Sequence, residues 1–154
     1  MKKTTAGVSW NDSDVRATLR KAGLRGTTPR VAVLGWMTTT RGPVSHADVV
    51  RGLEAAHVGI DRATVYRNLV DLAECGILRR TDFGDHVWRF ELLAAKKGER
   101  PVDHPHFVCT DCGEVSCLTG VAVQIVGNAA APRAVRSRDV DVQLAGRCND
   151  CSHK

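Results

Sequence analysis

Two short cysteine pairs constrain the fold of this chain more than any other feature. Cys109 and Cys112 lie in "CTDC", and Cys148 and Cys151 lie in "CNDC", so each pair has the spacing C-x-x-C. Two such pairs supply the four thiolates of a tetrahedral structural zinc site, and a metal that closes a long loop strongly stabilises a small unit. The residues between the pairs must then fold back until the pairs meet. The sequence therefore predicts a small C-terminal unit held by a Zn²⁺ clamp.

Other roles for the six cysteines fit the sequence less well. The chain begins "MKKTTAGVSWNDSD", without an apolar run after the lysines, and it has no apolar stretch near the ~20 residues of a membrane span. We expect a soluble, cytoplasmic protein with no membrane contact, and thiols stay reduced in that compartment, which disfavours disulfides. Neither pair precedes a helix in a βαβ unit, as a thioredoxin-like redox couple would, and neither follows the proline of a base deaminase.

The N-terminal half predicts four helices and a β-hairpin. Apolar side chains recur at helical spacing in four segments, each with residues suited to N-capping at its start, at 11–24, 28–37, 45–56 and 61–76. Thr28 is the expected N-cap of the second helix, with Pro29 as its first residue. Two runs rich in β-branched and aromatic residues, 77–81 and 86–92, flank the turn sequence "DFGD". Helices followed directly by a hairpin predict a winged helix-turn-helix domain.

Positive charge is concentrated in the same half. Residues 1–90 hold 14 Lys or Arg and 9 Asp or Glu, whereas residues 91–154 hold 8 of each, so the first part carries the whole net charge of +5. Such an asymmetry suits a part that faces a polyanion such as DNA, although a merely solvated basic surface is the alternative.

The fourth predicted helix has the features of a DNA-reading helix. Its apolar face consists of Val65, Leu69 and Leu72, so polar residues near the start of the helix point outward. The start of a recognition helix is where side chains reach base edges in the major groove. Residues before and at the start of the second helix suit phosphates. The alternative is an ordinary solvated helix face. The candidate DNA-binding residues are Arg25, Thr28, Arg30, Arg62, Thr64, Tyr66 and Arg67.

The remaining sequence predicts a second, smaller domain. The stretch "LAAKKGERPVD" is charged, contains Gly and Pro and lacks periodicity, as linkers do. Beyond it we expect three strands, at 106–110, 114–118 and 139–146, and one helix, at 119–131. The predicted fold is α+β, with a winged-helix DNA-binding domain at 1–92, a hinge at 93–104 and a small α/β domain at 105–154.

Five motifs are distinctive as an ordered set: "TTPRVAVL", "DRATVYRNLVDLAECGILRR", "WRFEL", "HPHFVCTDCGEV" and "GRCNDC". Together they resemble the ferric uptake regulator superfamily of bacterial metal-responsive repressors, in family order and over most of residues 20–151. The resemblance implies that the second domain is a dimerisation domain and that a homodimer binds palindromic, usually AT-rich operators. It also implies a repressor of metal uptake and homeostasis genes, not an enzyme. Thr64, Tyr66 and Arg67 fall on the family's recognition-helix motif.

The resemblance further implies a regulatory metal site between the two domains. Its ligands would be Glu91 from the wing motif, His104 and His106 from the H-x-H before the first cysteine pair, and Cys117. This cysteine stands where relatives usually have an acidic ligand. Two imidazoles, a carboxylate and a thiolate favour zinc, because soft sulfur suits that ion, with Fe²⁺ or Mn²⁺ as alternatives. The predicted function is a zinc-responsive repressor, and the alternative is an iron-responsive or peroxide-sensing regulator of the same superfamily.

Simpler roles stay open for some of these residues. Cys117 could be a small buried residue on a strand, and the two histidines could be polar ends of the linker. Cys75, at the end of the fourth helix, is assigned no role.

Two further histidines are additional ligand candidates. Pro43 occupies the family's usual histidine position before the third helix, and His46 lies shortly after it. His46 is either a ligand or, as we favour, a surface residue in the first turn after an N-cap. His86, on the hairpin, is either a ligand or an exposed strand residue.

Overall fold

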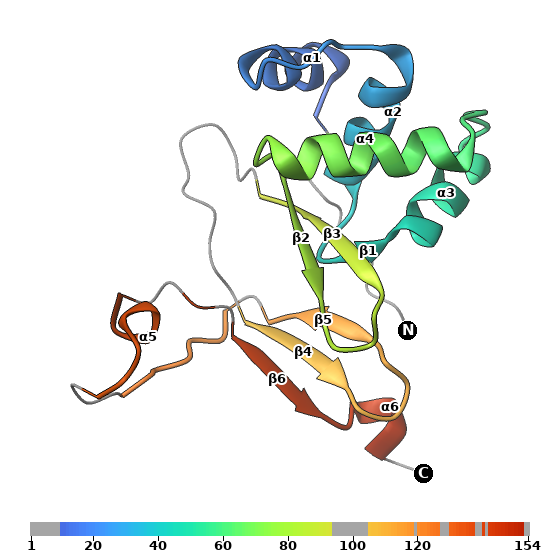
Figure 1. Cartoon of the computed structure of the whole chain (residues 1–154). Coiled ribbons are helices and arrows are strands. Elements are labelled where there is room, and N and C mark those ends of the chain that lie inside the picture. Colours follow the sequence, from blue (N-terminus) through green and yellow to red (C-terminus); the bar gives the residue numbers. More distant parts are fainter. Residues whose placement is uncertain are drawn as a thin grey trace. The chain divides into compact units, whose positions relative to one another are not determined.

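The computed structural model describes residues 10–93, 105–118, 120–126, 130–137, 140 and 142–152, and Figure 1 shows the course of the chain. The chain divides into two compact units, Met1–Pro101 and Val102–Lys154. Helices combine with two small three-stranded sheets, so the fold is α+β, as predicted. Within the described ranges, no helix has the length and apolar character needed to cross a membrane.

The first unit contains the four predicted helices. They are α1 (Asp12–Lys21), α2 (Thr28–Thr39), α3 (His46–Ala55) and α4 (Arg62–Glu74). Asn11 and Asp61 each accept a hydrogen bond from the amide three residues on, at 2.8 and 2.9 Å, and Ser45 forms a reciprocal capping box with Asp48. These caps satisfy amides that the helices leave without partners, which is why α1, α3 and α4 begin at these positions.

The start of α2 differs from the prediction by one residue. Thr27 is the N-cap, its side chain makes no capping hydrogen bond, and Pro29 is the second residue of the helix. The prediction of Thr28 as the N-cap is therefore wrong. Two successive threonines give the same local signal, so the sequence could not tell which of them precedes the helix.

The predicted hairpin is confirmed and has a third, very short strand. β2 (Leu78–Asp82) and β3 (Trp88–Leu92) pair antiparallel, and β1 (Val44–Ser45) pairs with the other edge of β3, giving the order β1-β3-β2. The Asp82 carboxylate accepts hydrogen bonds from the amides of Gly84 (2.8 Å) and His86 (3.1 Å), which shapes the turn. β1 was not predicted, because two residues are too short to show alternation.

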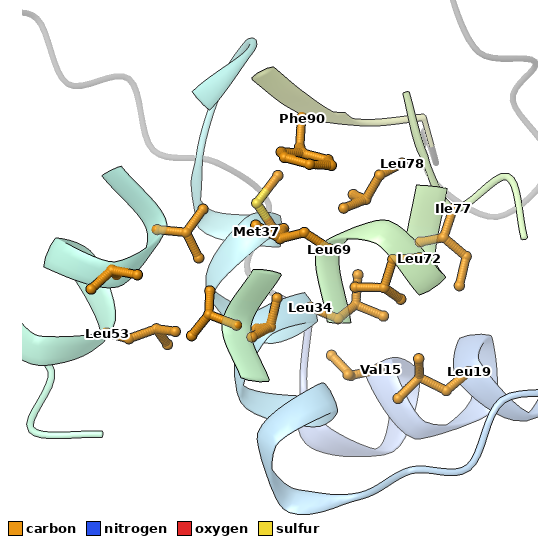
Figure 2. Packing of buried hydrophobic residues seen from close by; sticks show 14 residues of the cluster. Val15, Leu19, Leu34, Met37, Leu53, Leu69, Leu72, Ile77, Leu78 and Phe90 are labelled. Carbon is orange, nitrogen blue, oxygen red and sulfur yellow. The ribbon is translucent and has the colours of Figure 1, made fainter. Parts of the chain in front are cut away.

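One apolar cluster joins the helices to the hairpin. Val65, Leu69 and Leu72 of α4 are fully buried, so the predicted inward face of this helix is confirmed. Figure 2 shows the packing of the cluster, whose buried members are Val15, Leu19, Val33, Leu34, Met37, Val49, Val50, Leu53, Val65, Leu69, Leu72, Ile77, Leu78 and Phe90. Because α4 is buried on this face, its orientation within the first unit is fixed by packing.

The second unit is a small mixed sheet with two short helices. β4 (His106–Cys109) pairs antiparallel with β5 (Val115–Cys117) and parallel with β6 (Gln143–Gly146), in the order β5-β4-β6. The helices are α5 (Arg133–Ser137) and α6 (Asn149–Ser152). Of the described residues in this unit, only Pro105, His106 and Cys109 are buried. The sheet therefore lacks the large apolar core of the first unit.

The predicted helix at 119–131 is wrong for the residues of this segment that the structure describes, because none of 120–126, 130 and 131 is helical; residues 119 and 127–129 lie outside the described residues. Residues 121–126 have no regular secondary structure, and the helix α5 lies further along, at Arg133–Ser137. Alternating Val121, Val123 and Ile125 are β-branched and lose side-chain freedom in a helix, and Gly120 adopts φ +88°. Of the predicted strand at 139–146, the last four residues form β6, and residues 139 and 141 lie outside the described part of the chain.

Helix α3 packs on α2 through a glycine that leaves room for an indole. A Cβ added at Gly52 would overlap the ring of Trp36, whereas one added at Gly35 would have no heavy atom within 4 Å. We predict that the overlap in Gly52→Ala costs about 1–3 kcal/mol of stability. The higher helix propensity of alanine offsets ~1 kcal/mol of this cost. Gly35→Ala, which gains the propensity without the overlap, should be neutral or stabilising. Chemical denaturation of both variants checks this, and equal stabilities would contradict the packing.

Candidate functional site

Four cysteine sulfurs meet at one end of the second sheet. The Sγ atoms of Cys109, Cys112, Cys148 and Cys151 all lie within 4.8 Å of one another, and the Cys112–Cys148 distance is 3.9 Å. All six cysteines of the chain are free thiols. A tetrahedral ion with metal–sulfur bonds of about 2.3 Å has sulfur–sulfur edges of about 3.8 Å. The four cysteines that the sequence singled out are thus brought together in an arrangement that could hold one metal ion.

The parallel pairing of β4 with β6 brings the two cysteine pairs together. Cys109 is opposite Gly146 in the register, and the amide of Thr110 donates to the Gly146 carbonyl at 2.8 Å. Residues that follow two parallel strands emerge at the same end of a sheet, so the turn after β4 and the start of α6 are neighbours. Cys112 lies in that turn, and Cys148 immediately precedes α6.

Tight hydrogen-bonded turns set the spacing within each pair. The amide of Gly113 donates to the Cys109 carbonyl at 2.9 Å, and Gly113 adopts φ +70°, which glycine reaches at no steric cost. In the second pair, the amide of Cys151 donates to the Cys148 carbonyl at 3.1 Å. Each C-x-x-C segment is therefore a closed turn that directs both sulfurs to one side.

The thiols of the cluster ionise unequally. The pKa of Cys109 is lowered to about 6, because the backbone N–H groups of Cys112 and Cys148 donate to its sulfur; the Cys148 nitrogen is 3.3 Å from it. The pKa of Cys151 is raised by its hydrogen bond with Cys148, by burial and by the neighbouring Cys109 thiolate. One thiolate forms readily and then opposes ionisation of the others, so four thiolates together require a cation.

A second pair of candidate ligands lies on the strands β4 and β5. His106 and Cys117 are direct cross-strand partners, and a ring nitrogen of His106 lies within 4.8 Å of Cys117 Sγ. The His106 side chain is buried and Cys117 is half-buried. Directly opposed residues of an antiparallel pair share one face of the sheet, so an imidazole and a thiol face the same side.

The other two predicted regulatory ligands do not belong to the described part of the second unit. Glu91 lies in β3 of the first unit, opposite Arg79 in the register with β2. His104 lies outside the described residues. The structure of the second unit thus brings together two of the four predicted ligands.

The additional histidine candidates occupy unlike surroundings. His46 is the first residue of α3, its Nε2 atom lies 2.9 Å from the carbonyl oxygen of Arg62, and its ring contacts Tyr66. His86 is in the hairpin turn with φ +59°, and its side chain is 97% exposed at 3.8 Å from the Asp82 carboxylate. His46 is therefore held against α4 within the first unit, whereas His86 faces solvent.

The N-terminal half of α4 presents an exposed polar face. Arg62, Tyr66 and Arg67 are exposed, and Thr64 is half-buried. The Thr64 hydroxyl accepts a hydrogen bond from Arg67 at 3.4 Å, and its carbonyl accepts one from Asn68 at 2.9 Å. Arginine and tyrosine side chains at the start of a helix can reach both phosphates and base edges.

The candidate DNA-binding residues near the start of α2 differ in solvent exposure. Arg25 and Thr28 are exposed, whereas the Arg30 side chain is only 15% exposed. Arg30 forms an ion pair with Asp71 of α4 and donates to the Arg25 carbonyl at 3.0 Å. Its guanidinium therefore links α2 to α4 and holds the loop before α2.

Two side-chain contacts with α4 had no signal in the sequence. The Arg30–Asp71 pair joins residues 41 positions apart, and the contact of His46 with Tyr66 joins residues from different helices. Neither periodicity nor a local motif indicates such pairs, because both depend on how the helices pack.

Comparison with known proteins places these features in one family. The sequence model of the Ferric uptake regulator family matches residues 21–144. The "Ferric uptake regulation protein" of Cupriavidus metallidurans is 33% identical over 142 residues, which cover 90% of this chain and 95% of that protein. The "Peroxide operon regulator" of Bacillus subtilis is 27% identical, with coverage of 89% and 90%.

A solved structure agrees in fold over most of the chain. The ferric uptake regulator of Pseudomonas aeruginosa, determined with manganese, has a TM-score of 0.62 and 26% identity, and the match covers 87% of this chain and 97% of that one. The chain therefore belongs to the ferric uptake regulator family, whose members are metal-responsive, DNA-binding transcriptional regulators and not enzymes.

Proposed function

We propose that this protein is a zinc-responsive repressor that acts as a homodimer on palindromic operators of metal uptake and homeostasis genes in the cytoplasm. A structural Zn²⁺ is held by the four clustered cysteines, and a regulatory Zn²⁺ is held by Glu91, His104, His106 and Cys117. The observation that carries the choice of zinc is the His106–Cys117 pair, in which an imidazole and a thiol face the same side of one sheet.

Three observations support a structural role for the cysteine cluster. The 3.9 Å sulfur–sulfur distance matches the edge of a tetrahedral zinc–thiolate site, which is about 3.8 Å. The cluster needs a cation to hold four thiolates. The described part of the second unit buries only three residues, too few for an independent apolar core. When bound, zinc would supply the cross-link that a larger core supplies elsewhere.

The ligand chemistry of the second cluster supports zinc in the regulatory role. A half-buried thiol beside a buried imidazole offers soft and borderline donors, which zinc accepts in four-coordinate sites. Iron and manganese sites more often use nitrogen and oxygen alone. The metal response is measured by the coupling free energy between metal binding and DNA binding, which is typically about 1–3 kcal/mol. Such a coupling raises operator affinity about 5- to 150-fold.

An exposed apolar stretch supports the homodimer. Val121, Val123, Ile125 and Val126 form an extended stretch with exposed fractions from 41% to 86%, and Leu144 of β6 is 37% exposed. Contiguous exposed apolar residues mark interaction surfaces in proteins. A second copy of the chain is the partner that a palindromic operator requires, because its two half-sites mirror a two-fold axis.

The exposed face of α4 supports DNA recognition. The core fixes the orientation of α4 in the first unit, so Arg62, Tyr66 and Arg67 form a pre-organised surface. Arginine pairs with guanine or phosphate, and a tyrosine ring can meet a thymine methyl group. Arg25 and Thr28 suit phosphates. Arg30 contributes by holding α2 to α4 through its ion pair with Asp71. It could contact a phosphate only if this ion pair were broken.

The second candidate function is an iron-responsive or peroxide-sensing regulator. It is favoured by the similarity to the Bacillus subtilis protein named "Peroxide operon regulator". In a peroxide sensor, peroxide would be the oxidant and bound iron would direct it to the protein's own ligands. Cys117 argues against a site of nitrogen and oxygen ligands alone. The thiol itself could instead be the oxidised group.

Removing one cysteine of the structural cluster tests the clamp. We predict that Cys148→Ser lowers the zinc content of protein purified without chelator by one ion per chain and exposes the amides of β4 and β6 to rapid hydrogen exchange. Cys75→Ser, which removes a thiol packed against the core of the first unit, should keep the zinc. Unchanged zinc content in Cys148→Ser would refute the clamp.

Removing a ligand from the second cluster tests the switch. We predict that Cys117→Ser or His106→Ala reduces the stimulation of DNA binding by zinc from about 5- to 150-fold to near unity, while the structural zinc stays bound. Ser116→Ala, an exposed position on the same strand, is the matched control and should respond like the wild type. A mobility-shift titration with zinc makes the measurement. Full metal response in either ligand variant would show that the assignment is wrong.

Arginine variants distinguish base contacts from phosphate contacts. We predict that Arg67→Ala weakens binding by about 1–3 kcal/mol and relaxes specificity at one base position. Arg25→Ala should weaken binding uniformly across DNA sequences. It should also lower, by about 1, the steepness with which the logarithm of the affinity falls with the logarithm of the salt concentration. Affinities for a set of operator variants at several salt concentrations check both expectations. Identical behaviour of the two variants would contradict the division of roles.

A further inference from the structure

We propose that His46 is a positioning residue for DNA recognition, because its imidazole holds the ring of Tyr66 and the first turn of α4 in the orientation that meets DNA. The inference rests on the proposed function, in which α4 reads the operator. It gives His46 a role that is neither metal ligation nor that of a simple surface residue.

The backbone of His46 is anchored from two sides. The preceding residue, Ser45, pairs with Arg89 in the sheet, and its amide donates to the Asp48 carboxylate at 2.9 Å. The Asp48 amide donates in return to the Ser45 hydroxyl at 3.2 Å, which completes the capping box. The imidazole thus projects from a rigid junction between the sheet and α3.

Two contacts join this imidazole to α4. The His46 Nε2 atom lies 2.9 Å from the carbonyl oxygen of Arg62, and a carbonyl only accepts, so Nε2 carries the proton and donates. The rings of His46 and Tyr66 have centroids 5.6 Å apart and are inclined by 82°. This edge-to-face geometry is a favourable arrangement of aromatic rings. Together the contacts restrain both the helix start and the tyrosine ring.

The restrained ring belongs to the proposed DNA-binding face. Tyr66 is 39% exposed, and it lies four residues after Arg62, so both project from the same side of α4. A tyrosine that is free in solution loses rotamer freedom when it binds DNA, whereas one already held does not. From the usual cost of immobilising a side chain, we expect His46 to increase operator affinity about 2- to 10-fold.

The first test observes Tyr66 directly and needs no DNA. Tyr66 is the only tyrosine in the chain, so labelling the full-length, zinc-loaded protein with 3-fluorotyrosine reports on this ring alone. His46→Ala should shift the fluorine resonance and narrow the line as the ring gains motion. His57→Asn, an exposed histidine replaced by a residue that tolerates its φ of +57°, should change neither. An unchanged resonance in His46→Ala overturns the proposal, whatever the protein does with DNA.

The second test is a double-mutant cycle on DNA. The probe is a palindromic, AT-rich duplex selected in vitro on the wild-type protein at saturating zinc. His46→Ala should weaken binding about 2- to 10-fold in the wild-type background and cause a clearly smaller loss in Tyr66→Ala, where the ring contact is already absent and only the hold on the first turn of α4 remains. His46→Gln, which can still donate to the Arg62 carbonyl, should recover part of the affinity.

The other outcomes separate the competing explanations. Equal losses in both backgrounds overturn the proposal, since His46 then touches DNA or supports the fold in general. His46→Ala could instead change the zinc concentration that gives half-maximal DNA binding, without changing the affinity at saturating zinc. That result also overturns the proposal and indicates that His46 is a metal ligand. Failure of the wild-type protein to select any duplex refutes the proposed function and with it the DNA role of His46, even where the fluorine result holds.

Discussion

The parallel pairing of β4 with β6 is the constraint on which the second unit depends. It places the ends of two strands side by side, and each end continues into a tight turn that carries a cysteine pair. Four thiols within 4.8 Å repel one another as soon as more than one ionises. A bound cation would turn this repulsion into a cross-link and compensate for the small number of buried residues in the described part of this unit. The same sheet also sets His106 opposite Cys117.

The first unit uses a different source of rigidity. A continuous apolar cluster fixes α4 against the other helices and the hairpin, and polar contacts then refine its exposed face. Arg30 links α2 to Asp71 near the C-terminal end of α4, while His46 links α3 to the first turn of α4. The exposed side chains of α4 that we propose to contact DNA are therefore supported by the apolar core and by two side-chain contacts from the neighbouring helices.

The sequence predicted features that depend on local spacing. The four helices, the hairpin and the cysteine cluster could be predicted because apolar periodicity, capping residues and C-x-x-C spacing are local signals. The helix expected at 119–131 was wrong, since Val121, Val123 and Ile125 favour extended backbone over helix. The contacts of Arg30 and His46 could not be predicted, because each joins helices whose packing no local pattern specifies. The regulatory ligand roles came from resemblance alone and stay predictions for all four residues, Glu91, His104, His106 and Cys117.

Operator affinity measured against the free concentration of each metal tests whether zinc is the regulatory metal of this protein. Full-length protein that retains its structural zinc is titrated with buffered Zn²⁺, Fe²⁺ and Mn²⁺ under anaerobic conditions, with a selected palindromic duplex as the probe. We predict that Zn²⁺ drives tight binding at the lowest free concentration, because the proposed regulatory ligands include a thiolate. Activation by Fe²⁺ or Mn²⁺ at concentrations where Zn²⁺ has no effect would contradict it.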